Sequence, residues 1–192
     1  GKAFAQYAGD YFGSMPRLRS TPNSSWYHVG WTLSDSKPVR SNSANLYLLA
    51  RYQYVEPTAL ACPAKDQKDQ VMTAEMRDWQ SMADVSYSYQ NQFAPRTSRL
   101  EREPHLAILA DKNPRFVVHN GNRFTHLTTL PDSASSLTHH GHGQNVLFAN
   151  GGVRWCSTSI MPNGDNIWLA DGIADYNGTE VPSRDDDAFL VP

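Results

Sequence analysis

The sequence predicts an α+β domain in which helices come first and antiparallel strands, joined by long loops, come later. Apolar residues recur at helical spacing near the N-terminus and again in residues 41–55. Two short β-favouring runs flank Asn150-Gly151. Because 192 residues suit one domain, we expect residues 1–192 to fold as a single globular unit.

The first predicted helix covers residues 1–12. Its apolar stripe, with spacing i, i+1, i+4, i+5, i+8 and i+9, consists of Ala3, Phe4, Tyr7, Ala8, Tyr11 and Phe12. Gly13 follows as a stop signal. The pattern predicts an amphipathic helix with one buried face.

The second predicted helix covers residues 41–55. Leu46, Leu49 and Tyr52 contribute to its apolar face. Ser41 or Ser43 can cap it, because a hydroxyl oxygen accepts a hydrogen bond from an otherwise unpaired backbone amide. A short helix is also expected in residues 73–79.

The strands are predicted from alternation and from turn residues. Residues 85–89 alternate apolar and polar side chains, and residues 106–110 form a short apolar run that ends in Asp-Lys-Asn-Pro. Residues 146–148 and 153–155 flank Asn150-Gly151. Since Asn and Gly tolerate positive φ, this pair predicts a hairpin with a tight primed turn.

Composition and motifs exclude several classes of function. The net charge is −2 and 19% of residues are charged, without a basic face, so nucleic acid is not an expected partner. No apolar run reaches ~18 residues, so no segment of this sequence is predicted to span a membrane. Gly-x-Ser-x-Gly, phosphate-binding glycine loops and His-Glu-x-x-His do not occur. We therefore expect a protein that is not an enzyme.

The segment around the predicted hairpin resembles a known family. His140 is followed by nine residues, 141–149, and then by Asn150-Gly151. This is similar to the pseudopilin-like proteins whose C-terminal half carries His, nine residues and Asp-Gly, which are abundant in planctomycetes and related bacteria. Asn150 in place of Asp keeps the turn chemistry and removes a charge.

Further segments match the order found in that family. They are SANLYLLARYQYVEPTALACPA, SYSYQNQF, LAILADKNP, and GDNIWLADG with RDDDAFLVP. The resemblance implies a type IV pilin-like fold, in which an N-terminal helix packs on a small antiparallel sheet with long loops. Residues 1–12 would be the end of that helix, and residues 137–192 the hairpin and acidic C-terminal segment.

The resemblance also implies a function, a location and partners. The chain is expected to be the soluble, non-catalytic domain of a subunit of a pilus or pseudopilus-like filament, as in type II secretion. Its partners would be copies of itself or other pilin-like subunits, and the inner membrane through the missing N-terminal helix. The domain itself would be periplasmic or extracellular.

The histidines before the hairpin raise a second hypothesis. By residue type, His139, His140 and His142 suit a transition metal. In an extended segment His140 and His142 would share a face while His139 points away. A third ligand would then come from elsewhere, with His119, His126 and Asp111 as candidates. The alternative is that His140 only fixes the entry to the hairpin. The rival function is a secreted metal-dependent or carbohydrate-binding domain that uses residues 139–142.

The acidic C-terminal segment raises calcium as a candidate cofactor, because carboxylate and amide oxygens in flexible loops are ligands that calcium prefers. The candidate ligands are Asp165, Asp171, Asp175, Asn177 and Glu180. The major pseudopilins of type II secretion, which this chain resembles more distantly, hold calcium in a C-terminal loop. The alternative is a solvated acidic loop.

Cys62 and Cys156 lie among apolar residues. They are either two free buried thiols or, in an exported protein, a disulfide. A disulfide would close a loop of roughly 95 residues and stabilise the fold by ~4 kcal/mol in the chain-entropy model.

Trp26, Tyr27 and Trp31 form an aromatic cluster in the sequence. Such residues either stack on sugars or, more often, fill a core or a subunit contact.

Overall fold

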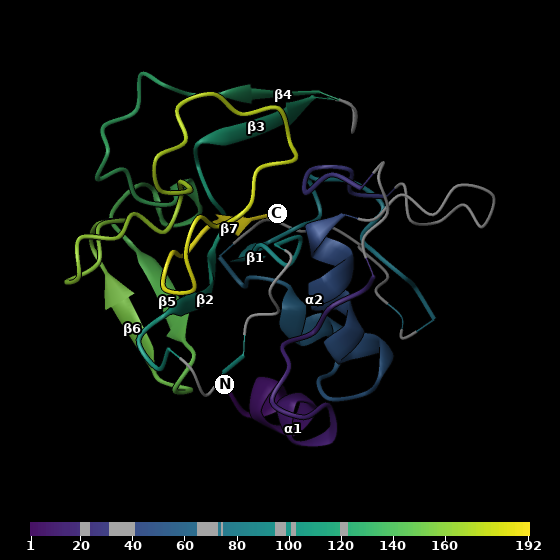
Figure 1. Ribbon diagram of the computed structural model, residues 1–192. Helices are drawn as coiled ribbons and strands as arrows, with labels where there is room; N and C mark the ends of the chain where they lie inside the picture. Colours follow the sequence, from purple (N-terminus) through teal and green to yellow (C-terminus); the bar gives the residue numbers. More distant parts are fainter. Residues whose placement is uncertain are drawn as a thin grey trace.

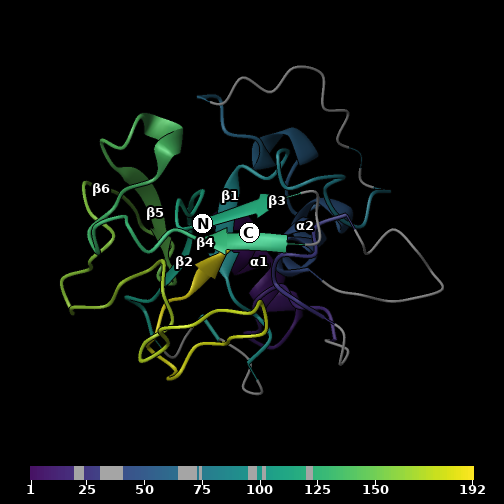
Figure 2. The ribbon, with the colours of Figure 1, turned by 90° about the horizontal axis from the view of Figure 1, so that it is seen from above.

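The computed structural model describes residues 1–19, 24–30, 41–64, 73, 75–94, 99–100, 103–119 and 123–192. In these residues a five-stranded antiparallel sheet has the order β6-β5-β2-β1-β7. Its strands are β1 Tyr87–Gln90, β2 Ala107–Asp111, β5 Gln144–Phe148, β6 Val153–Cys156 and β7 Leu190–Val191. A separate hairpin pairs β3 Phe116–His119 with β4 Arg123–His126. Figure 1 shows this hairpin at the opposite end of the molecule from α1 Lys2–Asp10, and Figure 2 shows it from above.

The predicted fold class is wrong. The described residues contain two short α-helices, of nine and ten residues, and are mostly β; no long N-terminal helix packs on a sheet in this part of the chain. The first helix ends at Asp10, because Phe12 and Gly13 both adopt positive φ, at 54° and 79°, and turn the chain away. β3, β4 and β7, which the sequence did not predict, add to the β content.

Helix α1 buries only part of its predicted stripe. Phe4, Tyr7 and Ala8 are buried, and the Phe4 ring lies 5.7 Å from the ring of Tyr89 in β1. Phe12, in contrast, is exposed. The helix therefore contacts the core through its middle, while its C-terminal end faces solvent.

Helix α2, Asn42–Arg51, is the central helix of the fold, and it is buried from Asn42 to Ala50. The predicted cap is confirmed, because Ser41 accepts a hydrogen bond from the Ala44 amide at 3.0 Å. Figure 1 shows α2 beside the main sheet, on the same side as α1. The helix expected in residues 73–79 is wrong: the described residues of this stretch, 73 and 75–79, form turns and bends.

The β5–β6 hairpin is confirmed, with Leu147 opposite Val153. Its turn differs from the predicted primed type, which needs positive φ at both central residues. Gly151 has a φ of 83°, whereas Asn150 is not in the left-handed region. The Asn150 side chain instead accepts a hydrogen bond from the Gly152 amide at 2.9 Å, so it holds the turn through its oxygen.

The chain has two hydrophobic clusters. The larger lies between the helices and the main sheet. The smaller is built around Trp26, whose ring centroid lies 4.8 Å from those of Phe116 and Phe124. Among the described helices, none is both long and apolar enough to cross a bilayer.

Candidate functional site

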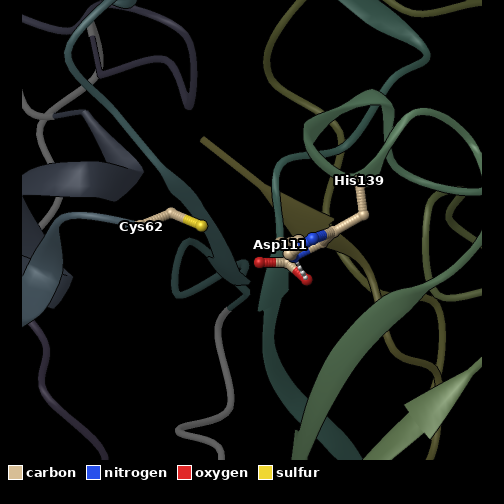
Figure 3. Close-up of side chains that lie close together, drawn as sticks. All are labelled: Cys62, Asp111 and His139. Carbon is tan, nitrogen blue, oxygen red and sulfur yellow. Dashed lines mark ion pairs between the residues drawn. The ribbon is translucent and has the colours of Figure 1, made fainter. Parts of the chain in front are cut away.

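Cys62, Asp111 and His139 form the candidate site, which we call the Cys–Asp–His cluster. One ligand atom from each residue lies within 4.8 Å of the other two. Figure 3 shows the Asp111 carboxylate between the other two side chains. A thiol, a carboxylate and an imidazole are all metal ligands by type.

Three separate elements supply the three side chains. Cys62 follows the 3-10 turn η2, Pro57–Leu60, and Asp111 is the last residue of β2. His139 is the last residue of a second 3-10 turn, η3, Leu137–His139. The cluster therefore forms only when the sheet and both turns have come together.

Ser136 explains why His139 faces inward. Its hydroxyl accepts a hydrogen bond from the Thr138 amide, at 3.3 Å, and donates one to the carbonyl of Lys112, at 2.7 Å. This ties η3 to the residue after Asp111. His140 then takes a left-handed conformation with φ 57° and ends the turn.

Residues 137–140 are therefore not extended. The prediction that His140 and His142 share one face of an extended segment is wrong. His140 and His142 are both exposed, and in the described residues neither joins a group of metal-ligating side chains. The sequence named Asp111 as a candidate third ligand, and the structure places it with His139. Cys62 was not expected there, because nothing in its local sequence signals the approach of β2.

Asp111 is a buried carboxylate, 1% exposed. Its Oδ2 accepts hydrogen bonds from Asn145, from the amide at 2.7 Å and from Nδ2 at 3.3 Å. His139 Nε2 lies 3.1 Å from the same oxygen, yet the geometry is not that of a hydrogen bond, so this buried nitrogen has no hydrogen-bond partner. The cluster thus holds a buried imidazole nitrogen with unused bonding capacity.

The order of the side chains distinguishes two kinds of chemistry. In a nucleophilic triad the imidazole stands between the nucleophile and the carboxylate. Here the carboxylate of Asp111 stands in the middle, as Figure 3 shows. The arrangement therefore favours ligation of a shared ion over activation of the Cys62 thiol by His139.

A cavity of about 440 Å³ opens beside the cluster, and its walls include Tyr87, Leu109 and Asn145 as well as the three donors. Burial, together with the neighbouring Cys62 and Asp111, raises the pKa of Tyr87 to about 12. A neutral phenol therefore stands at the edge of the site at physiological pH.

The other histidines named as candidate ligands lie on the β3–β4 hairpin. His119 Nε2 is 3.0 Å from Thr125 Oγ1, and the His126 ring packs against Phe116 and Tyr176. Burial, and then the charge of Arg115, lowers the pKa of His126. Both side chains therefore serve local packing rather than the Cys–Asp–His cluster.

The candidate calcium ligands lie in the acidic tail, which we define as residues 165–187. Glu180 accepts hydrogen bonds from the amides of Asn177 and Gly178 and from Trp26 Nε1. Asp171 pairs with Arg184, and Asp175 is exposed. In the described residues these carboxylates do not gather into a group of three, and calcium at the tail stays a prediction.

The two remaining candidate calcium ligands are Asp165 and Asn177. Asp165 accepts a hydrogen bond from the Ala188 amide at 3.1 Å, and burial raises its pKa to about 7. Asn177 Oδ1 accepts hydrogen bonds from the amide and hydroxyl of Thr179. Both side chains therefore hold neighbouring parts of the chain.

The two cysteines are free thiols in the structure. Cys62 belongs to the Cys–Asp–His cluster, while Cys156 is opposite Gln144 at the end of β6. Pairing between them stays a prediction.

The aromatic cluster proposed for sugar stacking is partly in the core. Trp26 is fully buried and Tyr27 is half-buried against it. Trp31 lies outside the described residues. Trp26 therefore fills the smaller hydrophobic cluster and offers no face to a sugar.

Comparison with family models, with curated proteins and with solved structures gave no match. The resemblance to the pseudopilin-like proteins therefore rests on the sequence segments quoted above.

Proposed function

We propose that this chain is the globular, non-catalytic part of a filament subunit of the pseudopilin-like class, which assembles with copies of itself or with related subunits. The proposal is supported by the resemblance of its segments, in order, to that class. The structural observation that carries it is an aromatic surface at the C-terminal end of α1.

This aromatic surface consists of Tyr11, Phe12 and Tyr52, which are 40%, 91% and 48% exposed. The rings of Tyr11 and Tyr52 stack with centroids 6.3 Å apart, and Tyr11 also stacks on buried Tyr7 at 4.3 Å. Contiguous exposed aromatic residues are typical of contact surfaces between proteins. A neighbouring subunit that covers them would remove Phe12 from water.

A cavity lies beside α1, next to the turn of the β5–β6 hairpin. Gly1, Ala5 and Gly9 lie four residues apart and line a cavity of about 340 Å³ together with the turn at 150–151. Phe4 and Ile108 also line the cavity, so this side of α1 faces the chain's own core and hairpin. The turn of the hairpin motif also meets the start of α1, since a Cβ on Gly1 would lie 2.7 Å from the Gly151 oxygen.

The remaining parts of the proposal come from the resemblance. It implies an apolar helix ahead of α1 that holds the subunit in the inner membrane, and a domain that faces the periplasm or the outside of the cell. In that arrangement α1 connects the apolar helix to the globular domain, and the aromatic surface lies close to the neighbouring subunits.

Assembly tests the proposal. In sedimentation velocity we expect this chain to be a monomer or weak dimer. In the full-length protein expressed in its host, Phe12→Ser with Tyr52→Ser should strongly reduce filament assembly, because contact area is lost from both exposed rings. Val117→Ser is the matched control, since Val117 is an exposed apolar residue on β3. Equal assembly of the double variant and the wild type would contradict the proposal, as would a large, tight assembly of this chain alone.

A further inference from the structure

We propose that the Cys–Asp–His cluster is a binding site for a divalent transition metal, with Zn²⁺ as the best fit. The thiol of Cys62, the carboxylate of Asp111 and the imidazole of His139 converge within 4.8 Å. Zinc binds these three donor types with bonds of about 2.0–2.3 Å, which puts neighbouring donors roughly 3.3–3.8 Å apart. A movement of about 1 Å would close the cluster around the ion.

The bonding state of the cluster supports a cation at its centre. His139 Nε2 is buried without a hydrogen-bond partner, although its side chain as a whole is 25% exposed. In the described residues, the ion-pair partner of Asp111 is this same histidine. A buried nitrogen without a hydrogen-bond partner costs free energy, and one cation bound between it and the buried carboxylate would give both groups a ligand bond.

The donor set selects the kind of metal. Calcium prefers six to eight oxygen ligands, whereas sulfur and imidazole nitrogen favour zinc and other late first-row metals. Three protein ligands leave one tetrahedral position open. The cavity of about 440 Å³ beside the cluster gives a water molecule room to fill that position.

The site adds a structural role to the filament proposal and does not depend on it. The three ligands come from the segment after η2, the end of β2 and the end of η3. A metal would therefore cross-link the main sheet to both 3-10 turns. These three segments lie far apart in the sequence. We expect the ion to stabilise the folded domain, since it binds the folded chain in preference to the unfolded one.

Metal titration tests the site. The protein is purified without a histidine tag, treated with a chelator under reducing conditions, and titrated with Zn²⁺. We expect one ion per chain and a rise in Tm of roughly 5–10 °C when free Zn²⁺ exceeds Kd 100-fold. Titration with Co²⁺ should give a thiolate-to-metal absorption band, which reports the Cys62 ligand directly. Absence of binding, or binding without that band, would overturn the proposal.

A histidine and a cysteine outside the cluster provide matched control variants. His139→Gln and Cys62→Ala should weaken Zn²⁺ binding by at least about 10–100-fold, the loss typical of even indirect supporting residues. His140→Gln and Cys156→Ala should bind as the wild type does, because neither residue belongs to the cluster. If Cys62→Ala does not fold, His139→Gln decides, since its side chain reaches the surface. Equal losses in His139→Gln and His140→Gln would refute the site, while the assembly experiment would be unaffected.

Discussion

The acidic tail and the Cys–Asp–His cluster use carboxylates in opposite ways. In the tail, Glu180 and Asp187 accept hydrogen bonds from backbone amides, and Asp171 pairs with Arg184. In the cluster, Asp111 shares a buried space with a thiol and with an imidazole nitrogen that has no hydrogen-bond partner. The tail is rich in metal-ligating residue types, yet its oxygens hold its own loops.

The difference shows that the number of ligand-type residues in a segment is a poor guide to a metal site. What matters is whether donors from separate elements converge and whether they still have bonding capacity. Five candidate ligands within sixteen residues of the tail fail the first criterion in the described chain, whereas three single residues from distant segments meet both. Three experiments on the tail test whether its carboxylates are held by the chain itself.

The largest effect is expected at Asp187, which is fully buried. Its carboxylate accepts hydrogen bonds from the amides of Asp171, at 3.1 Å, and Ser183. Asp187→Ala leaves these donors without their charged acceptor and should lower the free energy of unfolding by about 3 kcal/mol. Asp186→Ala, one residue away, should change it by less than about 0.5 kcal/mol, because that carboxylate forms an exposed ion pair with Arg184. Urea denaturation measures both, and similar losses would mean that the tail is not held by Asp187.

An intermediate effect is expected from the titration of Asp165. Burial raises its pKa to about 7, with Asp187 and Asp186 adding to the rise while the Ala188 amide and Arg184 oppose it. The unfolded value is about 3.9, so the folded state binds the proton more tightly and stability should fall as the pH rises from about 4 to about 7. Allowing for solvent screening of a partly exposed carboxyl, the loss is about 1–2 kcal/mol.

Asp165→Asn should remove this part of the pH dependence. The comparison is made by urea denaturation of both proteins at pH 4.5 and pH 7.5. Asp78, whose buried carboxyl also has a pKa raised to about 6, is present in both and cancels in the difference. Parallel pH profiles for the two proteins would show that Asp165 does not titrate in this range.

The smallest effect is expected from calcium. Because Glu180 and Asp171 already have partners, millimolar Ca²⁺ should shift Tm by less than about 1 °C relative to EGTA. Differential scanning fluorimetry with Mg²⁺ as the control cation measures this. A clear rise specific to Ca²⁺ would support the calcium hypothesis and would mean that the tail rearranges around the ion.

Local chemistry made some elements predictable. Ser41 caps α2, and the β5–β6 hairpin lies where Asn150-Gly151 places it, because a cap and a tight turn depend on a few neighbouring residues. The resemblance, in contrast, led to a long N-terminal helix and the wrong fold class. The positive φ of Phe12, which ends the helix, is a conformation that a phenylalanine rarely adopts and that no sequence pattern announces.

Long-range contacts were not predictable from local patterns. The sequence of β4 is polar enough to predict a loop, and β7 has only two residues. Neither strand therefore shows the alternation of apolar and polar residues that predicts a longer strand. The inward direction of His139 depends on Ser136 bonding to Lys112, which turns an apparently extended segment into η3. The candidate site could be guessed from His139 and Asp111, but Cys62 could be found only from the structure.

The place of β7 has a consequence for biosynthesis. Tyr89 of β1 pairs with Val191, about one hundred residues later in the chain, and Asn42 Nδ2 donates to the carbonyls of both residues. The main sheet therefore cannot complete this edge until residue 191 has left the ribosome. Such long-range pairing slows folding and leaves one edge of β1 unpaired while the rest of the chain is being synthesised.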